Sequence, residues 1–198
     1  MEIDSAFTVI SAEMTYQVLD SRWMSIRTHH RFELEATRPH RFYFREYNWD
    51  NEKGIEKLPR ILSGRQQSGR AAHRLQGPVV SGPNGWRLLV VDLGRILGPG
   101  EREVVEIEHF FVRVAPDADG FVGALAREGM ERIHLTAILP NRNDLRLHSK
   151  HRAGSRDTEE WEHIQMLAGT TEAGSIKVTH KISDPTPGRR YRLGWDQH

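Results

Sequence analysis

The chain has 198 residues, with 28 basic and 27 acidic side chains and a formal net charge of +1. It contains no cysteine, which excludes disulfides, zinc–thiolate sites and thiol nucleophiles. No segment approaches the roughly 20 apolar residues that a membrane helix needs, and the acidic start is unlike a signal peptide. We therefore expect one cytoplasmic domain over residues 1–198, with no membrane contact and with residues 1–14 as a candidate flexible extension.

Hydrophobic and polar residues alternate with a period of two through most of the chain, as they do in half-buried antiparallel strands. Trp23–Ala36 shows this alternation first. After a turn at Pro39, His40–Tyr47 repeats it, with Phe42 and Phe44 on one side. The two segments predict a β-hairpin.

The pattern is lost between Asn48 and Arg70, where no strand period continues. We interpret this stretch as a long loop, with one helical turn near Ile55–Leu58. Loops of this length are uncommon in compact domains and are often functional. The segment 48–70 is therefore the first place to look for a binding surface.

Strand patterns return after this loop and continue to the end of the chain. The pair Asn84-Gly85, which favours a tight hairpin turn, joins the first two of them. Phe121–Met130 is expected to form a short helix, and the cationic Leu145–Arg152 to form an edge strand. The predicted strands in this part are Ala71–Val80, Trp86–Leu93, Arg102–Val114, Arg132–Pro140, Leu145–Arg152, Trp161–Gly169, Ser175–Ser183 and Tyr191–Trp195.

About nine or ten strands with frequent turns and very little helix predict an all-β fold. The expected architecture is an antiparallel β-sandwich, and a β-barrel is the alternative. Strands and helices do not alternate along the chain, which argues against a parallel α/β sheet.

Residues that could carry chemistry are frequent but scattered. There is no glycine-rich nucleotide-binding motif and no G-x-S-x-G elbow, and His29 and His30 are adjacent, so on a strand they point to opposite faces. We therefore predict no metal site, no cofactor and no catalytic residues, which favours a protein that is not an enzyme. A hydrolase or lyase is kept as an alternative, which requires at least three of six side chains to converge in one pocket: His29, His30, His109, His134, Glu106 and Glu108.

Clusters of arginine are the strongest indication of a binding surface. No acidic residue lies between Lys57 and Arg74, and a second basic cluster runs from Arg142 to Arg156. Guanidinium groups bind carboxylates and phosphates, and Trp49 could anchor a partner at the entrance of the loop. The candidate binding residues are Trp49, Arg60, Arg65, Arg70, Arg74, Arg146 and Arg152.

These features favour a non-enzymatic module that recognises a partner protein or a small ligand through the loop 48–70 and the arginines beside it. The strand Leu145–Arg152 could also pair with a strand of a partner. Nucleic-acid binding through the same arginines is an alternative, although the loop lacks the interleaved aromatic residues that stack on bases. The sequence does not indicate an oligomeric state.

Three segments together resemble a known class of bacterial domain. They are Leu93–Phe111, Arg132–Pro140 and the closing Pro185–Trp195, which has the form P-x-x-G-x-x-Y-x-L-x-W. Their order resembles immunoglobulin-like β-sandwich modules at the C-termini of bacterial, especially actinobacterial, regulatory and defence proteins. The resemblance implies an accessory module that senses a ligand or binds a partner, and it implies no catalytic residues.

Overall fold

The computed structural model describes residues 6–20, 25–48, 55–64, 72–112, 120–140, 145–152, 162–167, 169–172 and 174–197. These residues form β-strands, turns and loops and contain no helix, which confirms the predicted all-β fold. The strands are β1 (Phe7–Asp20), β2 (Ser25–Ala36), β3 (His40–Asn48), β4 (Ile55–Ile61), β5 (Arg74–Leu75), β6 (Val80–Ser81), β7 (Trp86–Leu97), β8 (Arg102–Val112), β9 (Gly120–Leu125), β10 (Arg132–Pro140), β11 (Leu145–Arg152), β12 (Glu162–Met166), β13 (Thr170–Glu172), β14 (Ser175–Ser183) and β15 (Arg190–Gln197).

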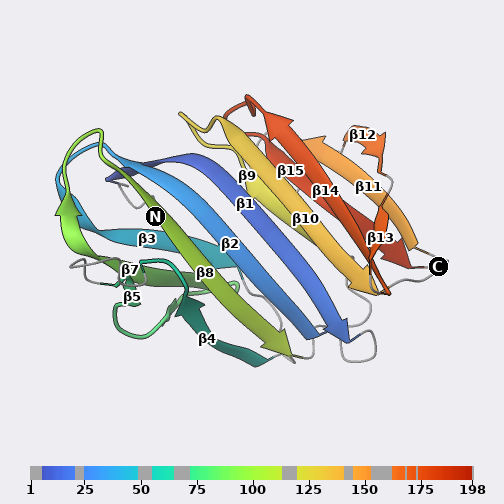
Figure 1. The fold of residues 1–198 in the computed structure, drawn as a ribbon, viewed down its shortest axis with the longest axis horizontal. Helices are drawn as coiled ribbons and strands as arrows, with labels where there is room; N and C mark the ends of the chain where they lie inside the picture. Colours follow the sequence, from blue (N-terminus) through green and yellow to red (C-terminus); the bar gives the residue numbers. More distant parts are fainter. Residues whose placement is uncertain are drawn as a thin grey trace.

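The strands form one large sheet and two small ones (Figure 1). The large sheet has seven strands in the order β13-β14-β10-β1-β2-β8-β4. One small sheet has the order β12-β11-β15-β9, and the other has the order β3-β7-β5 with β6 also paired to β7. All neighbours are antiparallel except β1 and β10, which are parallel. None of the three sheets closes on itself in the described part of the chain.

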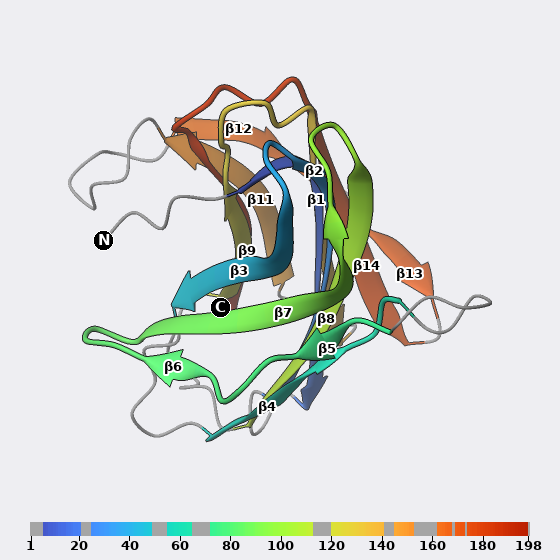
Figure 2. The same cartoon turned by 90° about the vertical axis from the view of Figure 1, so that its left-hand side faces the viewer.

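Both small sheets pack on the same face of the large sheet, here called its inner face (Figure 2). The predicted sandwich is therefore confirmed, with the second layer divided into two parts. A strand of the large sheet shows how the sequence produces this arrangement. In β8, Val105 and Ile107 are fully buried on the inner face, whereas Glu106 and Glu108 alternate with them on the outer face.

The core between the layers contains residues of all three sheets. Leu34 and Leu135 come from the large sheet, Leu89 from the sheet of β7, and Leu193 from the sheet of β15. Each of them is fully buried, and burying one such side chain contributes about 1.5–3 kcal/mol to folding. The core cluster therefore connects the three sheets.

The predicted hairpin between Trp23–Ala36 and His40–Tyr47 is wrong. β2 pairs with β1 and β8 in the large sheet, whereas β3 pairs with β7 in a small sheet. The bend at 37–39 moves the chain from one layer to the other, because both faces of β3 carry aromatic side chains that need cover.

Three segments have a different structure from the one predicted. Ile55–Ile61, expected within a long loop, forms β4 at the edge of the large sheet. Phe121–Met130, expected to be a short helix, begins with strand β9. Residues 7–14, expected in a flexible extension, belong to β1.

One predicted edge strand is not an edge. Leu145–Arg152 forms β11, which has β12 on one side and β15 on the other. It therefore offers no free edge to a partner. By contrast, the Asn84-Gly85 turn is confirmed, since both residues have positive φ between β6 and β7.

The described residues contain no helical segment with the length and hydrophobicity that a membrane crossing requires.

Candidate functional site

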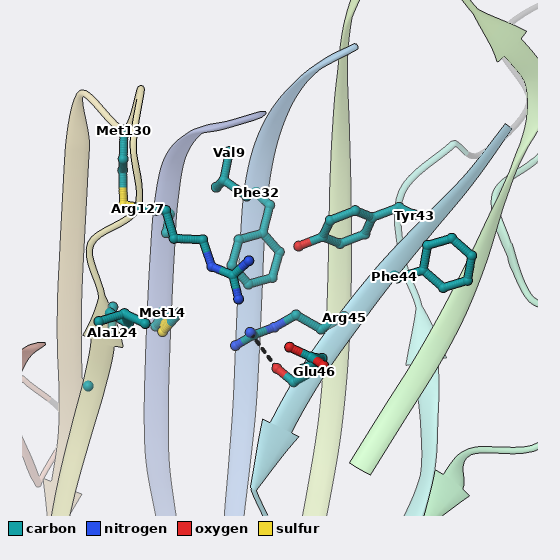
Figure 3. Close-up of a pocket in the computed structure, with 13 residues that line it drawn as sticks. Val9, Met14, Phe32, Tyr43, Phe44, Arg45, Glu46, Ala124, Arg127 and Met130 are labelled. Atoms are coloured by element: carbon teal, nitrogen blue, oxygen red, sulfur yellow. Dashed lines mark hydrogen bonds between the residues drawn. The ribbon is translucent and has the colours of Figure 1, made fainter. Parts of the chain in front are cut away.

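A cleft opens where the two small sheets face each other across the inner face of the large sheet (Figure 3). Its volume is about 120 Å³, below the roughly 300–1,000 Å³ of pockets that hold drug-sized ligands. The size suits one side chain or a small anion. The floor consists of Val9, Ala12 and Met14 of β1 and Phe32 of β2; β3 contributes Tyr43, Phe44, Arg45 and Glu46; β9 contributes Gly123, Ala124 and Leu125; Arg127 and Met130 follow β9.

Each wall of the cleft is the edge of a strand. Four consecutive residues of β3 and three consecutive residues of β9 line it. Successive side chains of a strand point to opposite faces, so a consecutive run lines a cavity with its main chain as well as with alternate side chains, here those of Tyr43 and Arg45. In the described part of the chain, β3 and β9 are both end strands of their small sheets. Two main-chain edges therefore face each other above an apolar floor.

Two guanidinium groups approach the middle of the cleft from opposite walls, Arg45 from β3 and Arg127 from the segment after β9 (Figure 3). Arg45 donates a hydrogen bond of 2.6 Å to the backbone oxygen of Glu46, and its guanidinium carbon lies 4.9 Å from the ring centre of Phe32. In the part of the chain that the structure describes, Arg45 Nε has no hydrogen-bond partner. Among the described residues, no carboxylate forms an ion pair with either arginine, although Glu46 also lines the cleft.

Tyr43 points a hydroxyl group toward these two cations (Figure 3). Its side chain is buried and packs against Phe7 and Phe32. Burial raises the pKa of Tyr43, and the positive charges of Arg45 and Arg127 oppose this effect. The hydroxyl therefore remains protonated at neutral pH and can donate a hydrogen bond. Two guanidinium forks and one hydroxyl form a donor-rich site for an anion.

Buried polar side chains continue from the cleft along the inner face. The rings of His30 and His109 lie 5.7 Å apart, and Tyr16 stacks on His30 at 5.8 Å. Burial and the charge of Arg45 hold the pKa of His30 well below its usual value, so this imidazole is neutral. Within the described ranges, Thr28 Oγ1, His30 Nε2 and His109 Nδ1 have no hydrogen-bond partner.

Glu56 of β4 lies at the far end of these buried polar side chains. Its carboxylate accepts a hydrogen bond from the Tyr47 hydroxyl and lies 3.5 Å from His109 Nδ1 and 3.7 Å from Arg87 Nε. Burial and Glu56 raise the pKa of Tyr47. Glu56 therefore orients the polar side chains at this end, whereas Arg45 at the other end has an N–H donor that no described residue accepts from.

The six side chains considered for a hydrolase do not converge. His30 and His109 lie on the inner face. His29, Glu106 and Glu108 lie on the outer face, and His134 alternates with buried neighbours in β10 and therefore also faces outward. The described residues contain no group of three or more His, Asp or Glu side chains that could hold a metal ion. The whole sequence also lacks the H-E-x-x-H motif of zinc peptidases.

The binding residues predicted from the sequence lie in several places. Trp49, Arg65 and Arg70 are outside the described residues, and Arg146 lies in β11 with a side chain that is also outside them. Arg60 lies 3.3 Å from Glu108 on the outer face, and Arg74 lies 3.0 Å from the buried Asp92. Arg152 is buried in β11. None of the described ones lines the cleft.

Sequence reasoning missed Arg45 and Arg127. One feature of the sequence points to Arg45. It shares a strand face with Tyr43 and Tyr47, so a cation lies among residues that can be buried. The sequence instead favours the opposite face of this strand, with Phe42 and Phe44, as the apolar one. Arg127 follows a segment that was expected to be helical, so its position relative to β3 could not be inferred.

Comparison with known proteins identifies the fold but no family. No family model matches the chain, and no curated protein matches it. Its structure is similar to a mutant two-domain M1 zinc metallopeptidase bound to L-tryptophan, with a TM-score of 0.51 and 11% identity over 96% of this chain. It is equally similar to the M1 zinc metallopeptidase from Deinococcus radiodurans, with a TM-score of 0.51 and 12% identity over 96% of this chain.

The chain spans well under half the length of these similar structures, 43% of the first and 42% of the second. At this level of identity the likeness concerns the fold alone. The all-β layered architecture described above therefore also occurs within larger two-domain proteins.

Proposed function

We propose that this chain is a non-catalytic binding module that holds a carboxylate group of a ligand or partner protein in the cleft between β3 and β9. The observation that carries the proposal is the pair Arg45 and Arg127, which face one cleft without a carboxylate partner among the described residues. Arg45 is partly buried and Arg127 is exposed, so the cost of a cation without a counter-ion falls on Arg45, and an incoming carboxylate would reduce that cost.

We further propose that the module is an accessory part of a longer protein. The resemblance of its second half to immunoglobulin-like accessory modules supports this role. Its similarity to 42–43% of the length of two-domain proteins is also consistent with it. The peptidase activity named for those proteins is theirs, and the lack of an H-E-x-x-H motif here supports a binding role for this chain.

The test is an NMR titration that observes the arginine Nε–H signals directly. The probe is acetyl-Val-Glu-Val-amide, and the matched control is the same tripeptide with Gln in place of Glu. We expect the Glu probe to shift the Arg45 and Arg127 signals and the Gln probe to leave them unchanged. Assignment uses the single variants Arg45→Gln and Arg127→Gln. Unshifted signals at millimolar Glu probe would disprove carboxylate binding in the cleft.

Two further variants separate the cleft from the arginines predicted from the sequence. Arg60→Gln makes the same substitution on the outer face, where Arg60 pairs with Glu108, and we expect it to leave the titration unchanged. Combined replacement of Arg60, Arg65 and Arg70 by serine tests the loop itself. If this triple variant abolished binding while Arg45→Gln with Arg127→Gln did not, the binding surface would be the loop.

A further inference from the structure

We propose that an extended segment of a partner protein pairs as an added strand with the free edge of β9 and places one acidic side chain in the cleft, on Arg45 and Arg127. This inference rests on the proposed function and specifies the form of the ligand. Three observations carry it: the direction of the β9 main chain, the composition of its edge, and the charge of the cleft.

The first observation is that β9 turns main-chain groups toward the cleft. The N–H of Ala126 donates to the oxygen of Arg189 at 2.8 Å, in the same register in which Leu125 opposes Arg190. Residue 126 therefore points its main-chain groups toward the β15 side. N–H and C=O directions alternate along an antiparallel strand, so Leu125 and Gly123 point theirs the other way, into the cleft. Among the described strands, none pairs with them.

The second observation is that β9 itself contains no charged residue, proline or bulge to protect its edge, although the Arg192 guanidinium of β15 lies 3.9 Å from the ring centre of Phe121. Proteins block free edges with charged side chains, proline or bulges. The β9 sequence Gly120–Leu125 contains no charged residue and no proline, and its pairing with β15 shows no register shift. Phe121 and Leu125 are 42% and 37% exposed, so the edge is also apolar. Such an edge is a natural site for strand addition.

The opposite wall is less suited to pairing. β3 carries charged residues at Arg41, Arg45 and Glu46, and the Arg45 guanidinium already occupies the backbone oxygen of Glu46. A segment added to β9 would therefore use β3 for side-chain contacts rather than for a second ladder. Arg45 and Arg127 then lie within the same cleft as the added strand.

The third observation concerns the occupant. The cleft offers positive charge without a carboxylate partner in the described residues, and its volume of about 120 Å³ fits a side chain better than a whole cofactor. An extended chain that carries Glu or Asp supplies both the main-chain groups for β9 and the carboxylate for the arginines. The occupant is therefore an acidic extended segment.

The first test uses fluorescence anisotropy with a labelled octapeptide of alternating Val and Thr that has one central Glu. Two modified versions carry N-methyl groups on the backbone amides of the odd or of the even positions. We expect one of these sets to weaken binding at least about tenfold, because it removes several main-chain hydrogen bonds, and the other set to have a smaller effect. Equal affinity of all three peptides, or no binding of the unmodified one, would overturn strand addition.

The second test changes the protein at one position. Leu125→Pro removes the N–H that points into the cleft and leaves the hydrogen bonds to β15, and proline is tolerated at such edge positions. Leu125→Ala is the matched control, since it shortens the side chain but keeps the N–H. We expect Leu125→Pro to bind the octapeptide about three- to tenfold more weakly than Leu125→Ala. Thermal melts confirm that both variants are folded.

The two proposals fail in different ways. If the Glu tripeptide shifts the arginine signals while Leu125→Pro and Leu125→Ala bind the octapeptide equally, carboxylate recognition holds and strand addition is wrong. If N-methylation matters but Gln replaces Glu in the octapeptide without loss, the carboxylate site is wrong. Sedimentation of the free protein tests the other occupant, because a dimer that Leu125→Pro dissociates would show that a second copy fills the cleft.

Discussion

Arg45 of β3 affects side chains on its own strand and on β2 of the large sheet. Its guanidinium lies over the ring of Phe32, and its charge acts on the pKa values of His30 and Tyr43. Burial is the main cause that lowers the pKa of His30, and the charge of Arg45 lowers it further. His30 therefore adds no positive charge beside Arg45, whose guanidinium an incoming carboxylate can reach.

Asp92 of β7 is a buried carboxylate whose charge is compensated by several hydrogen bonds. It is only 1% exposed, and its two oxygens accept hydrogen bonds from Arg41 at 2.7 and 2.9 Å. Arg74 at 3.1 Å and the N–H of Gly94 at 2.8 Å complete the set. These partners tie β3, β5 and β7 together, and they hold the pKa of Asp92 well below its usual range.

We expect Asp92→Asn to lower the free energy of unfolding by about 2 kcal/mol at pH 7, because the amide nitrogen faces guanidinium donors. The folded carboxyl has a depressed pKa, so its contribution is fully present above the unfolded value near pH 4 and is lost as the pH falls below it. Urea unfolding at several pH values should show the difference between Asp92→Asn and the unmodified protein shrinking from pH 5 to pH 3.

Arg74→Gln provides a graded comparison for that measurement. Its side chain is 67% exposed, and Arg41 alone still contacts both oxygens of Asp92. We expect a loss below about 1 kcal/mol. A difference for Asp92→Asn that stays constant between pH 5 and pH 3 would contradict the role of the ionised carboxylate.

At the level of strands, regular alternation made most of the large sheet predictable. Arg132–Pro140 and Ser175–Ser183 form β10 and β14 as expected, and Arg102–Val112 forms β8 without an irregularity against β2. In β14 only one face is apolar, and in β8 and β10 one face is apolar over more of the strand than the other, so the pattern itself indicates which side is buried.

The predictions that failed concern segments in which the alternation of apolar and polar residues does not show which face is buried. β3 has aromatic residues on both faces, so its partner and its inward face follow from the packing of the layers. β9 has six residues with two glycines, too short a stretch for period two to differ clearly from a helical period. The cleft lies between β3 and β9, which is why its arginines could not be predicted.

Gly120 fixes how closely β9 approaches β15. A Cβ at this position would overlap the indole of Trp195, which is 3% exposed in the core. We expect Gly120→Ala to lower the free energy of unfolding by about 1–3 kcal/mol, because either β9 or the indole must move. Urea unfolding followed by tryptophan fluorescence measures the loss.

Gly98→Ala is the matched control, because the nearest atom to its added Cβ is Glu101 Oε2 at 3.4 Å. We expect a change within about 0.5 kcal/mol. Equal stability of the two variants would show that β9 is not held against Trp195. A displaced β9 should also weaken octapeptide binding in Gly120→Ala, since the same strand forms one wall of the cleft.

For the molecule as a whole, the division of the second layer into two sheets raises the question of whether they unfold separately. The cleft separates β3 from β9, but the core cluster contains side chains from all three sheets. Both small sheets bury their apolar residues only by contact with the large sheet (Figure 2). Each small sheet therefore depends on the same seven strands.

We expect the three sheets to unfold in one cooperative transition, because neither small sheet retains a buried face once the large sheet is lost. Trp86 reports on the sheet of β7, and Trp195 on the sheet of β15. Their ¹⁹F signals in protein labelled with 5-fluorotryptophan, assigned with Trp86→Phe and Trp195→Phe, should disappear with the same urea midpoint.

Leu135→Ala tests whether the two signals are coupled. Leu135 is fully buried on an interior strand of the large sheet and belongs to neither small sheet. Its removal should cost about 2–5 kcal/mol and shift both midpoints to lower urea together. If only one tryptophan signal shifted, or if the two midpoints already differed in the unmodified protein, the small sheets would be separate folding units. The walls of the cleft could then move independently, and a partner segment would bind by drawing them together.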